Sequence, residues 1–142
     1  MKTYKDLMFH QSYVNGEWKE NKADKIDVNN PADGSIVGQV DNSNVTTMKE
    51  AIDAAHLAFP IWKRKTAKDR SIILMKWFDL IMENKEAIAH IMALESGKPL
   101  EECKGEIGYG ASFIQWFAEQ AKRNNGTVIP GFTEDRRISV IR

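Results

Sequence analysis

The hydrophobic pattern changes its period near residue 46, and this change constrains the fold more than any other feature of the sequence. Before it, apolar and polar residues alternate in short runs, which is typical of half-buried strands. After it, apolar residues recur at the spacing of one face of an α-helix as far as about residue 124. Two short apolar runs follow. The sequence therefore predicts an α/β chain with β-hairpins first, helices in the middle and two strands at the end.

Two turn signals define the hairpins. Asn15-Gly16 is the strongest short-range hairpin signal, because both residues tolerate the positive φ of a type I′ turn. The second turn is Pro31-Ala32-Asp33-Gly34, which lies between an alternating run at 26–28 and a returning run at 36–40.

Four helices are predicted between residues 46 and 124. Thr47 and Glu50 have the spacing of a capping box, and Pro60 is expected to end this first helix. Thr66 can cap the second helix, whose apolar residues are Ile72, Ile73, Met75, Trp77, Phe78, Leu80 and Ile81. These residues cover so much of its circumference that the helix requires contacts on more than one side.

The next helix boundaries carry the strongest cap residues. Asn84 is expected to start a third helix over 85–95, and Gly97 suits its C-terminal cap. Pro99 suits the first turn of a fourth helix, which reaches about Asn124. Strands are then predicted at 127–129 and 138–141. The last strand runs into the terminus with no strand after it to pair with, and because proteins normally cover such an edge, we expect the chain to stop inside a larger sheet.

Charge and composition exclude several classes of partner. Lys plus Arg and Asp plus Glu both number 20, so electrostatics gives no reason to expect a nucleic acid or a membrane. The N-terminus lacks the apolar core of a secretory signal, and no run approaches the length of a membrane span. The single cysteine, Cys103, fits a reducing compartment. We therefore predict a cytoplasmic protein.

Three glycine-containing or basic motifs resemble known binding sites, but a structural role is favoured for each of them. Ser96-Gly97-Lys98-Pro99 lacks the upstream glycine of a phosphate loop, because Met92 stands there, and a helix cap is favoured. Gly105, Gly108 and Gly110 have the wrong order for a dinucleotide fingerprint and lie in a helical pattern, where small residues permit close packing. Lys63-Arg64-Lys65 is interpreted as a solvated loop between helices.

The remaining candidates also favour structural roles. Cys103 has acidic neighbours, which oppose thiolate formation, so a structural or surface cysteine is favoured over a nucleophile. The three histidines, His10, His56 and His90, share no motif, so a metal site is not predicted. The aromatic residues are interpreted as core or interface; they are Trp77, Phe78, Phe113, Trp116 and Phe117.

Six ordered segments carry more information together than any of them does alone. They are Tyr13-Val14-Asn15-Gly16-Glu17-Trp18, Val28-Asn29-Asn30-Pro31-Ala32-Asp33-Gly34, Gly38-Gln39-Val40, Ala54-Ala55-His56-Leu57-Ala58-Phe59 with Trp62, Arg70 with Leu74, and Glu95-Ser96-Gly97-Lys98-Pro99-Leu100 with Glu106-Ile107. In this order and spacing they resemble the N-terminal part of the aldehyde dehydrogenase superfamily. The run from Leu94 to Arg123 is most similar to the succinate-semialdehyde dehydrogenase branch.

The resemblance implies that the chemistry lies elsewhere. In this family a cysteine thiolate in a Gly-Gln-x-Cys motif attacks the aldehyde, hydride passes to NAD(P)+, and a glutamate activates water. An Asn in a Pro-Trp-Asn-Phe-Pro segment helps to hold the oxyanion. None of these motifs occurs in this chain, and Cys103 does not match the cysteine motif. The resemblance therefore implies no catalytic, cofactor-binding or metal residues here, and no NAD or NADP binding by this chain alone.

The resemblance also implies a domain assignment. Residues 1–127 correspond to the N-terminal part of the NAD(P)-binding domain, and residues 128–142 to the start of the bridging and oligomerisation segment; the catalytic domain is absent. The parent family implies an aldehyde substrate and a homo-oligomer. Glu106 lies near a position at which some members bind a structural cation. An alternative, suggested by the wide apolar surface, is a non-catalytic helical module that docks on a full-length subunit or another partner.

Overall fold

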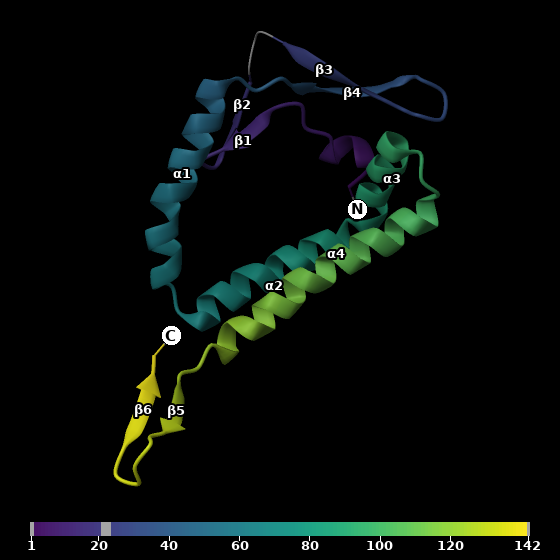
Figure 1. Cartoon of the computed structure of the whole chain (residues 1–142). Coiled ribbons are helices and arrows are strands. Elements are labelled where there is room, and N and C mark those ends of the chain that lie inside the picture. The colour runs from purple at the N-terminus through teal and green to yellow at the C-terminus, as the bar shows by residue number, and fades with distance from the viewer. Residues whose placement is uncertain (1, 21–23, 142) are drawn as a thin grey trace.

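The computed structural model describes residues 2–20 and 24–141 of the chain. Within these residues, three antiparallel two-stranded sheets flank a helical region (Figure 1). The strands are β1 (Ser12–Val14), β2 (Glu17–Lys19), β3 (Lys25–Asn29), β4 (Ile36–Asp41), β5 (Thr127–Pro130) and β6 (Arg137–Val140). The α-helices are α1 (Val45–Arg64), α2 (Ala67–Glu83), α3 (Lys85–Ser96) and α4 (Leu100–Gln120), and the short 3-10 helices are η1 (Tyr4–Leu7) and η2 (Ala121–Arg123).

The two N-terminal turns form as predicted. Asn15 and Gly16 have φ values of 52° and 83°, as the β1–β2 turn requires. In the β3–β4 turn, Gly34 has a φ of 75°, and the Asn30 side chain accepts a hydrogen bond of 3.0 Å from the backbone N–H of Ala32. The order of hairpins, four helices and terminal hairpin is therefore confirmed.

Both predicted ends of the first helix are wrong. The N-cap of α1 is Asn44, whose Oδ1 accepts from the N–H of Thr47 at 2.9 Å, whereas Glu50 pairs with Lys19. Pro60 lies inside α1, which continues to Arg64. Proline has no backbone N–H, so it leaves one carbonyl group of the preceding turn without its helical hydrogen bond. This part of α1 is exposed, and water can therefore solvate that carbonyl group.

The caps of the later helices agree with the prediction. Thr66 caps α2 by accepting from the N–H of Asp69 at 3.1 Å. Gly97 ends α3 in the left-handed region with a φ of 70°. Pro99 is the N-cap of α4, one position before the expected first turn. The Ser96–Pro99 segment is therefore a helix cap and a new helix start, as expected.

The interior of the helical region is built from small residues. α2 and α4 lie side by side, and α3 packs against α4 (Figure 1). The buried side chains between them are Ser71, Ala87, Ala89, Cys103, Ala111 and Ala118. Gly105, Gly108 and Gly110 lie inside α4, so they form a helix and no phosphate-binding turn. Small side chains let the helix axes approach, and the large side chains consequently point outward.

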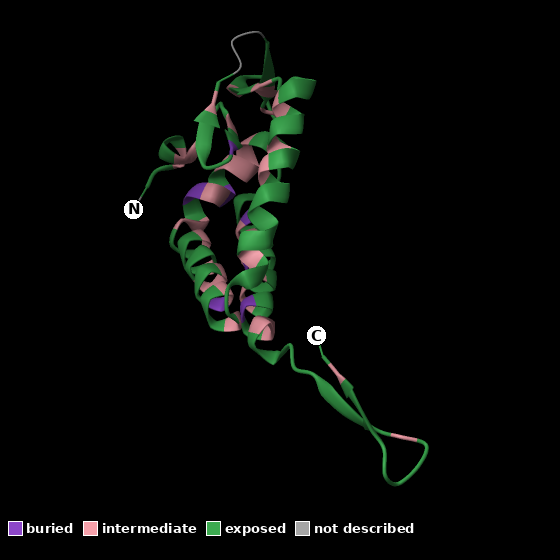
Figure 2. Ribbon diagram, turned by 90° about the vertical axis from the view of Figure 1, so that its left-hand side faces the viewer, coloured by how far each residue is buried: buried purple, intermediate pink, exposed green. Residues whose placement is uncertain are grey.

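Most of the chain is exposed (Figure 2), and the exposed residues include many large apolar ones. The accessible surface of the chain is 10969 Å², whereas a compact monomer of this mass exposes about 7,500 Å². On α2, Ile72, Ile73, Trp77 and Leu80 are exposed, so the described residues do not supply all the contacts that the sequence predicted for this helix. The β5–β6 hairpin projects away from the helices (Figure 2). No helix in the described residues combines the length and apolar character needed to cross a bilayer.

Candidate functional site

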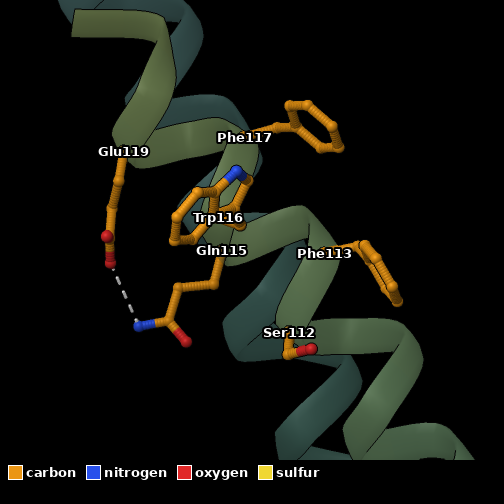
Figure 3. Close-up of a pocket in the computed structure, with 6 residues that line it drawn as sticks. All are labelled: Ser112, Phe113, Gln115, Trp116, Phe117 and Glu119. Carbon is orange, nitrogen blue, oxygen red and sulfur yellow. Dashed lines mark hydrogen bonds between the residues drawn. The ribbon is translucent and has the colours of Figure 1, made fainter. Parts of the chain in front are cut away.

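The most developed concave surface lies on the outer side of α4. It is an open depression of about 510 Å³, and its lining consists of Ser112, Phe113, Gln115, Trp116, Phe117 and Glu119 (Figure 3). Three of these residues, Ser112, Trp116 and Glu119, recur at helical spacing and therefore share one face of α4. All six side chains come from one helix. The depression is thus one wall of a site whose opposite wall is not made by the described residues.

Aromatic rings dominate this wall. Phe113, Trp116 and Phe117 are 47%, 56% and 60% exposed, so they are not core residues of this chain. The Gln115 side-chain amide donates to Oε1 of Glu119 at 3.3 Å, which holds the carboxylate along the helix (Figure 3). The lining contains no cation, and its one hydroxyl, that of Ser112, donates a hydrogen bond of 2.6 Å to the carbonyl oxygen of Tyr109. It can contact the apolar part of a ligand, but an anionic group would need a cationic partner outside the pocket.

The sequence named three of these rings only as core or interface aromatics. Because residue type and helical spacing are the same for a core face and a pocket wall, the pattern alone could not separate the two. The polar residues between the rings, Ser112, Gln115 and Glu119, were the available signal, since a fully buried face would rarely carry them.

Cys103 is placed where it cannot act as a nucleophile in this conformation. The residue is 0% exposed, and its thiol lies 3.9 Å from the carbonyl oxygen of Lys98. Cys103 is buried together with Ala87 and Ala89 of α3, the helix that packs against α4. The structure thus favours the structural cysteine that the sequence predicted.

Ion pairs account for the charged residues around the α3–α4 corner. Glu106, the residue near the family's cation position, pairs with Lys98, and the hydrogen bond from Lys98 is the main cause that raises the pKa of this lysine, followed by the charge of Glu106. Lys104 contacts Glu86 at 2.8 Å and Glu101 at 2.9 Å, and these hydrogen bonds raise its pKa. Lys104 thereby ties α4 to α3.

No metal-binding group was found in the part of the chain that the structure describes. His10 places Nδ1 2.6 Å from the carbonyl oxygen of Gln39, and His90 stacks at a tilt on Tyr4 with ring centroids 4.5 Å apart. These two histidines thus hold the N-terminal segment in place, while His56 lies on the exposed side of α1. The structure does not bring the three together.

Comparisons with known proteins agree on one family. The sequence profile described as "Aldehyde dehydrogenase family" matches residues 18–142. The succinate-semialdehyde dehydrogenase [NADP(+)] GabD of Escherichia coli (strain K12) is 49% identical over 138 residues, which are 96% of this chain and 29% of that protein. The glutarate-semialdehyde dehydrogenase of Pseudomonas putida (strain KT2440) is 47% identical over 96% of this chain and 28% of its own length.

The solved structures give the same result for the fold. The crystal structure of an aldehyde dehydrogenase from Brucella melitensis biovar abortus 2308 superposes with a TM-score of 0.88 at 50% identity, over 94% of this chain and 28% of that one. The chain therefore spans little more than a quarter of the length of the relatives it matches. Its helices and small sheets are those of the N-terminal portion of that fold, as the sequence predicted.

Proposed function

Because this chain belongs to the aldehyde dehydrogenase family, we propose that it supplies the N-terminal part of an NAD(P)-dependent enzyme that oxidises an aldehyde to the carboxylic acid. The observation that carries this proposal is the match to an NADP+-dependent enzyme over 96% of the chain at 49% identity. Within this part, residues 1–127 belong to the NAD(P)-binding domain, and residues 128–142 begin the bridging segment. In the whole enzyme, this segment takes part in forming a homo-oligomer.

We further propose that the substrate is an anionic aldehyde such as succinate semialdehyde. Two relatives are named for succinate and glutarate semialdehyde, and each of these compounds carries a carboxylate besides its aldehyde group. The aromatic wall of α4 suits the carbon chain of such a substrate. The wall offers only the carboxylate of Glu119 as a charged group, so the substrate carboxylate requires cations outside it.

The isolated chain is expected to have no dehydrogenase activity. Its one thiol is buried, and none of the described residues combines a nucleophile with a neighbouring base and oxyanion donors. The test is to incubate the purified chain with succinate semialdehyde and NAD+ or NADP+, and to follow the absorbance of the reduced nicotinamide. Reduction above the rate of a heat-denatured sample would show that this assignment is wrong.

The positive test is a chimaera. Residues 1–142 are joined to the part of the Escherichia coli enzyme that they do not cover, which is about 71% of that protein because the match covers 29% of it. A chain of the proposed function restores a folded, active enzyme. A chimaera that folds but oxidises no aldehyde would contradict the proposal.

A second candidate is a non-catalytic module that docks on a full-length subunit or another partner. The exposed apolar face of α2 and the open edges of the β5–β6 hairpin favour it. Size-exclusion chromatography with light scattering discriminates the two, with the chain measured alone and with the full-length Escherichia coli enzyme. A defined complex supports the module, and a monomer that binds nothing argues against it.

A further inference from the structure

Six basic residues converge on one corner of the molecule. Lys63, Arg64 and Lys65 end α1 and begin the loop to α2, and Lys68 lies in the first turn of α2. Lys122 and Arg123 form the end of η2, which packs against α2 at the end that follows α1 (Figure 1). We call these six residues the basic corner. Helix packing assembles it from two separate parts of the sequence.

The basic corner is exposed and carries an excess of positive charge. All six side chains belong to exposed residues. Within residues 2–20 and 24–141, none of them forms an ion pair, and Lys63 instead lies 5.8 Å from the ring centre of Phe59. Two carboxylates lie on the same helical turns. Asp69 and Glu119 offset two of the six positive charges, so an excess of positive charge remains.

The corner adjoins the aromatic wall of α4. Trp116 and Lys122 are separated by six residues of continuous helix, which span about 10 Å along the axis. The Debye length is about 8 Å at physiological ionic strength, so the field of the corner is partly screened over this distance, and at about 10 mM salt, where the Debye length is about 30 Å, it reaches the pocket. The pocket, whose one charged lining residue is Glu119, thus lies within reach of the corner's positive charges at low ionic strength.

We propose that the basic corner attracts the anionic aldehyde to the α4 wall and favours it over a neutral aldehyde of the same length. This inference rests on the proposed function. It concerns the approach and retention of the anion by long-range attraction, and it assigns the corner no contact with the reacting atoms. The corner therefore contributes to substrate selection.

A structural role for the same residues is the competing explanation. Lys63, Arg64, Lys122 and Arg123 end helical segments, where cations stabilise the helix dipole. A dipole role affects stability for every substrate equally. An attraction of the anion depends on the substrate's charge and on ionic strength, so kinetics can separate the two roles.

The expected effect follows from Coulomb's law. One unit charge about 10 Å from a monoanion changes its local concentration by about twofold in water before screening, and two charges change it by about fourfold. At low salt, where screening over 10 Å is weak, replacing Lys122→Gln together with Arg123→Gln should therefore lower kcat/KM for the anion by about threefold. The control is Lys5→Gln with Lys49→Gln, which removes the same charge from exposed residues outside the corner.

The experiment uses the chimaera with saturating NADP+ and two aldehydes of equal chain length, succinate semialdehyde and neutral butanal. kcat/KM is measured at an ionic strength of about 10 mM and again at about 1 M, where the Debye lengths are about 30 Å and 3 Å. At low salt, kcat/KM of the corner variant for the anion should be about threefold lower than that of the parent chimaera. Its kcat/KM should equal that of the parent chimaera at high salt, and for butanal at either salt concentration. The control variant should have the kcat/KM of the parent chimaera under every condition.

Each other result overturns a stated claim. An equal loss for both aldehydes, an equal loss in the control variant, or a loss that salt does not remove would overturn the role of the basic corner. A chimaera that does not fold, or that folds and oxidises neither aldehyde, would overturn the proposed function on which the inference rests. A change in melting temperature alone would assign these residues to the helix ends.

Discussion

Replacing Gly97 by alanine should destabilise the chain through two separable effects. Gly97 ends α3 with a φ of 70°, where a side chain costs about 1–2 kcal/mol. A Cβ atom placed there would also lie 2.8 Å from Cγ of Pro31 in the β3–β4 turn, so one of the two must shift. Forcing such an overlap costs about 1–3 kcal/mol. We therefore expect Gly97→Ala to lower the free energy of unfolding by about 2–5 kcal/mol, the sum of these two ranges.

Two other glycines separate these effects in urea unfolding followed by circular dichroism. Gly34 has a φ of 75° but nothing within 4 Å of an added Cβ, so Gly34→Ala measures the backbone cost alone. Gly105 lies within α4 and also has open space, so Gly105→Ala should stabilise the chain by about 0.5–1 kcal/mol. If Gly97→Ala cost no more than Gly34→Ala, the contact with Pro31 would not matter. Partial rescue by Pro31→Ala would confirm it.

Two further predictions concern Cys103 and Asp6. Cys103→Ala should destabilise the chimaera by roughly 1 kcal/mol through the lost buried sulfur but leave kcat unchanged, and a large loss of kcat at unchanged melting temperature would contradict the structural role. Hydrogen bonds from the Thr3 hydroxyl and backbone N–H lower the pKa of Asp6 below 3.8, so its stabilising contribution is present above that pH and is lost as pH falls through the lowered value. Thr3→Val should raise this pKa toward 3.8 in an NMR titration, and an unchanged pKa would show that the hydroxyl is not its main cause.

Local signals predicted the elements of the fold. The Asn15-Gly16 turn and the Gly97 cap depend on backbone conformations that few residues tolerate, so they can be read from residue type. The start of α1 was misassigned because Thr47 and Glu50 have the spacing of a capping box, although Asn44 three residues earlier provides the cap. The end of α1 could not be predicted from Pro60 alone either. Whether the helix continues past a proline depends on whether solvent can reach the carbonyl group that the proline leaves unpaired.

The candidate site was less accessible to sequence reasoning, because it depends on what covers each helix. Phe113, Trp116 and Phe117 follow a pattern that suits either a core or a pocket wall, and only their exposure in the structure separates the two. The basic corner is a second case. Lys63-Arg64-Lys65 alone suggests a solvated loop, and it becomes part of a larger charge cluster only when α2 and η2 pack together.

The distribution of side-chain size gives these exposed faces a common explanation. An ordinary domain buries its large apolar residues, but here alanine, serine and cysteine fill the α2–α3–α4 interior while Trp77, Phe113 and Trp116 lie outside. Small residues allow the helices to form a thin, closely packed layer, and a helix that is apolar on both sides is stable only when both sides are covered. The surface excess of about 3,500 Å² over a compact monomer is far more than the roughly 800 Å² that one partner buries in a standard interface. Under the proposed function, the part of the enzyme that this chain does not span would cover these faces and would supply the wall opposite α4.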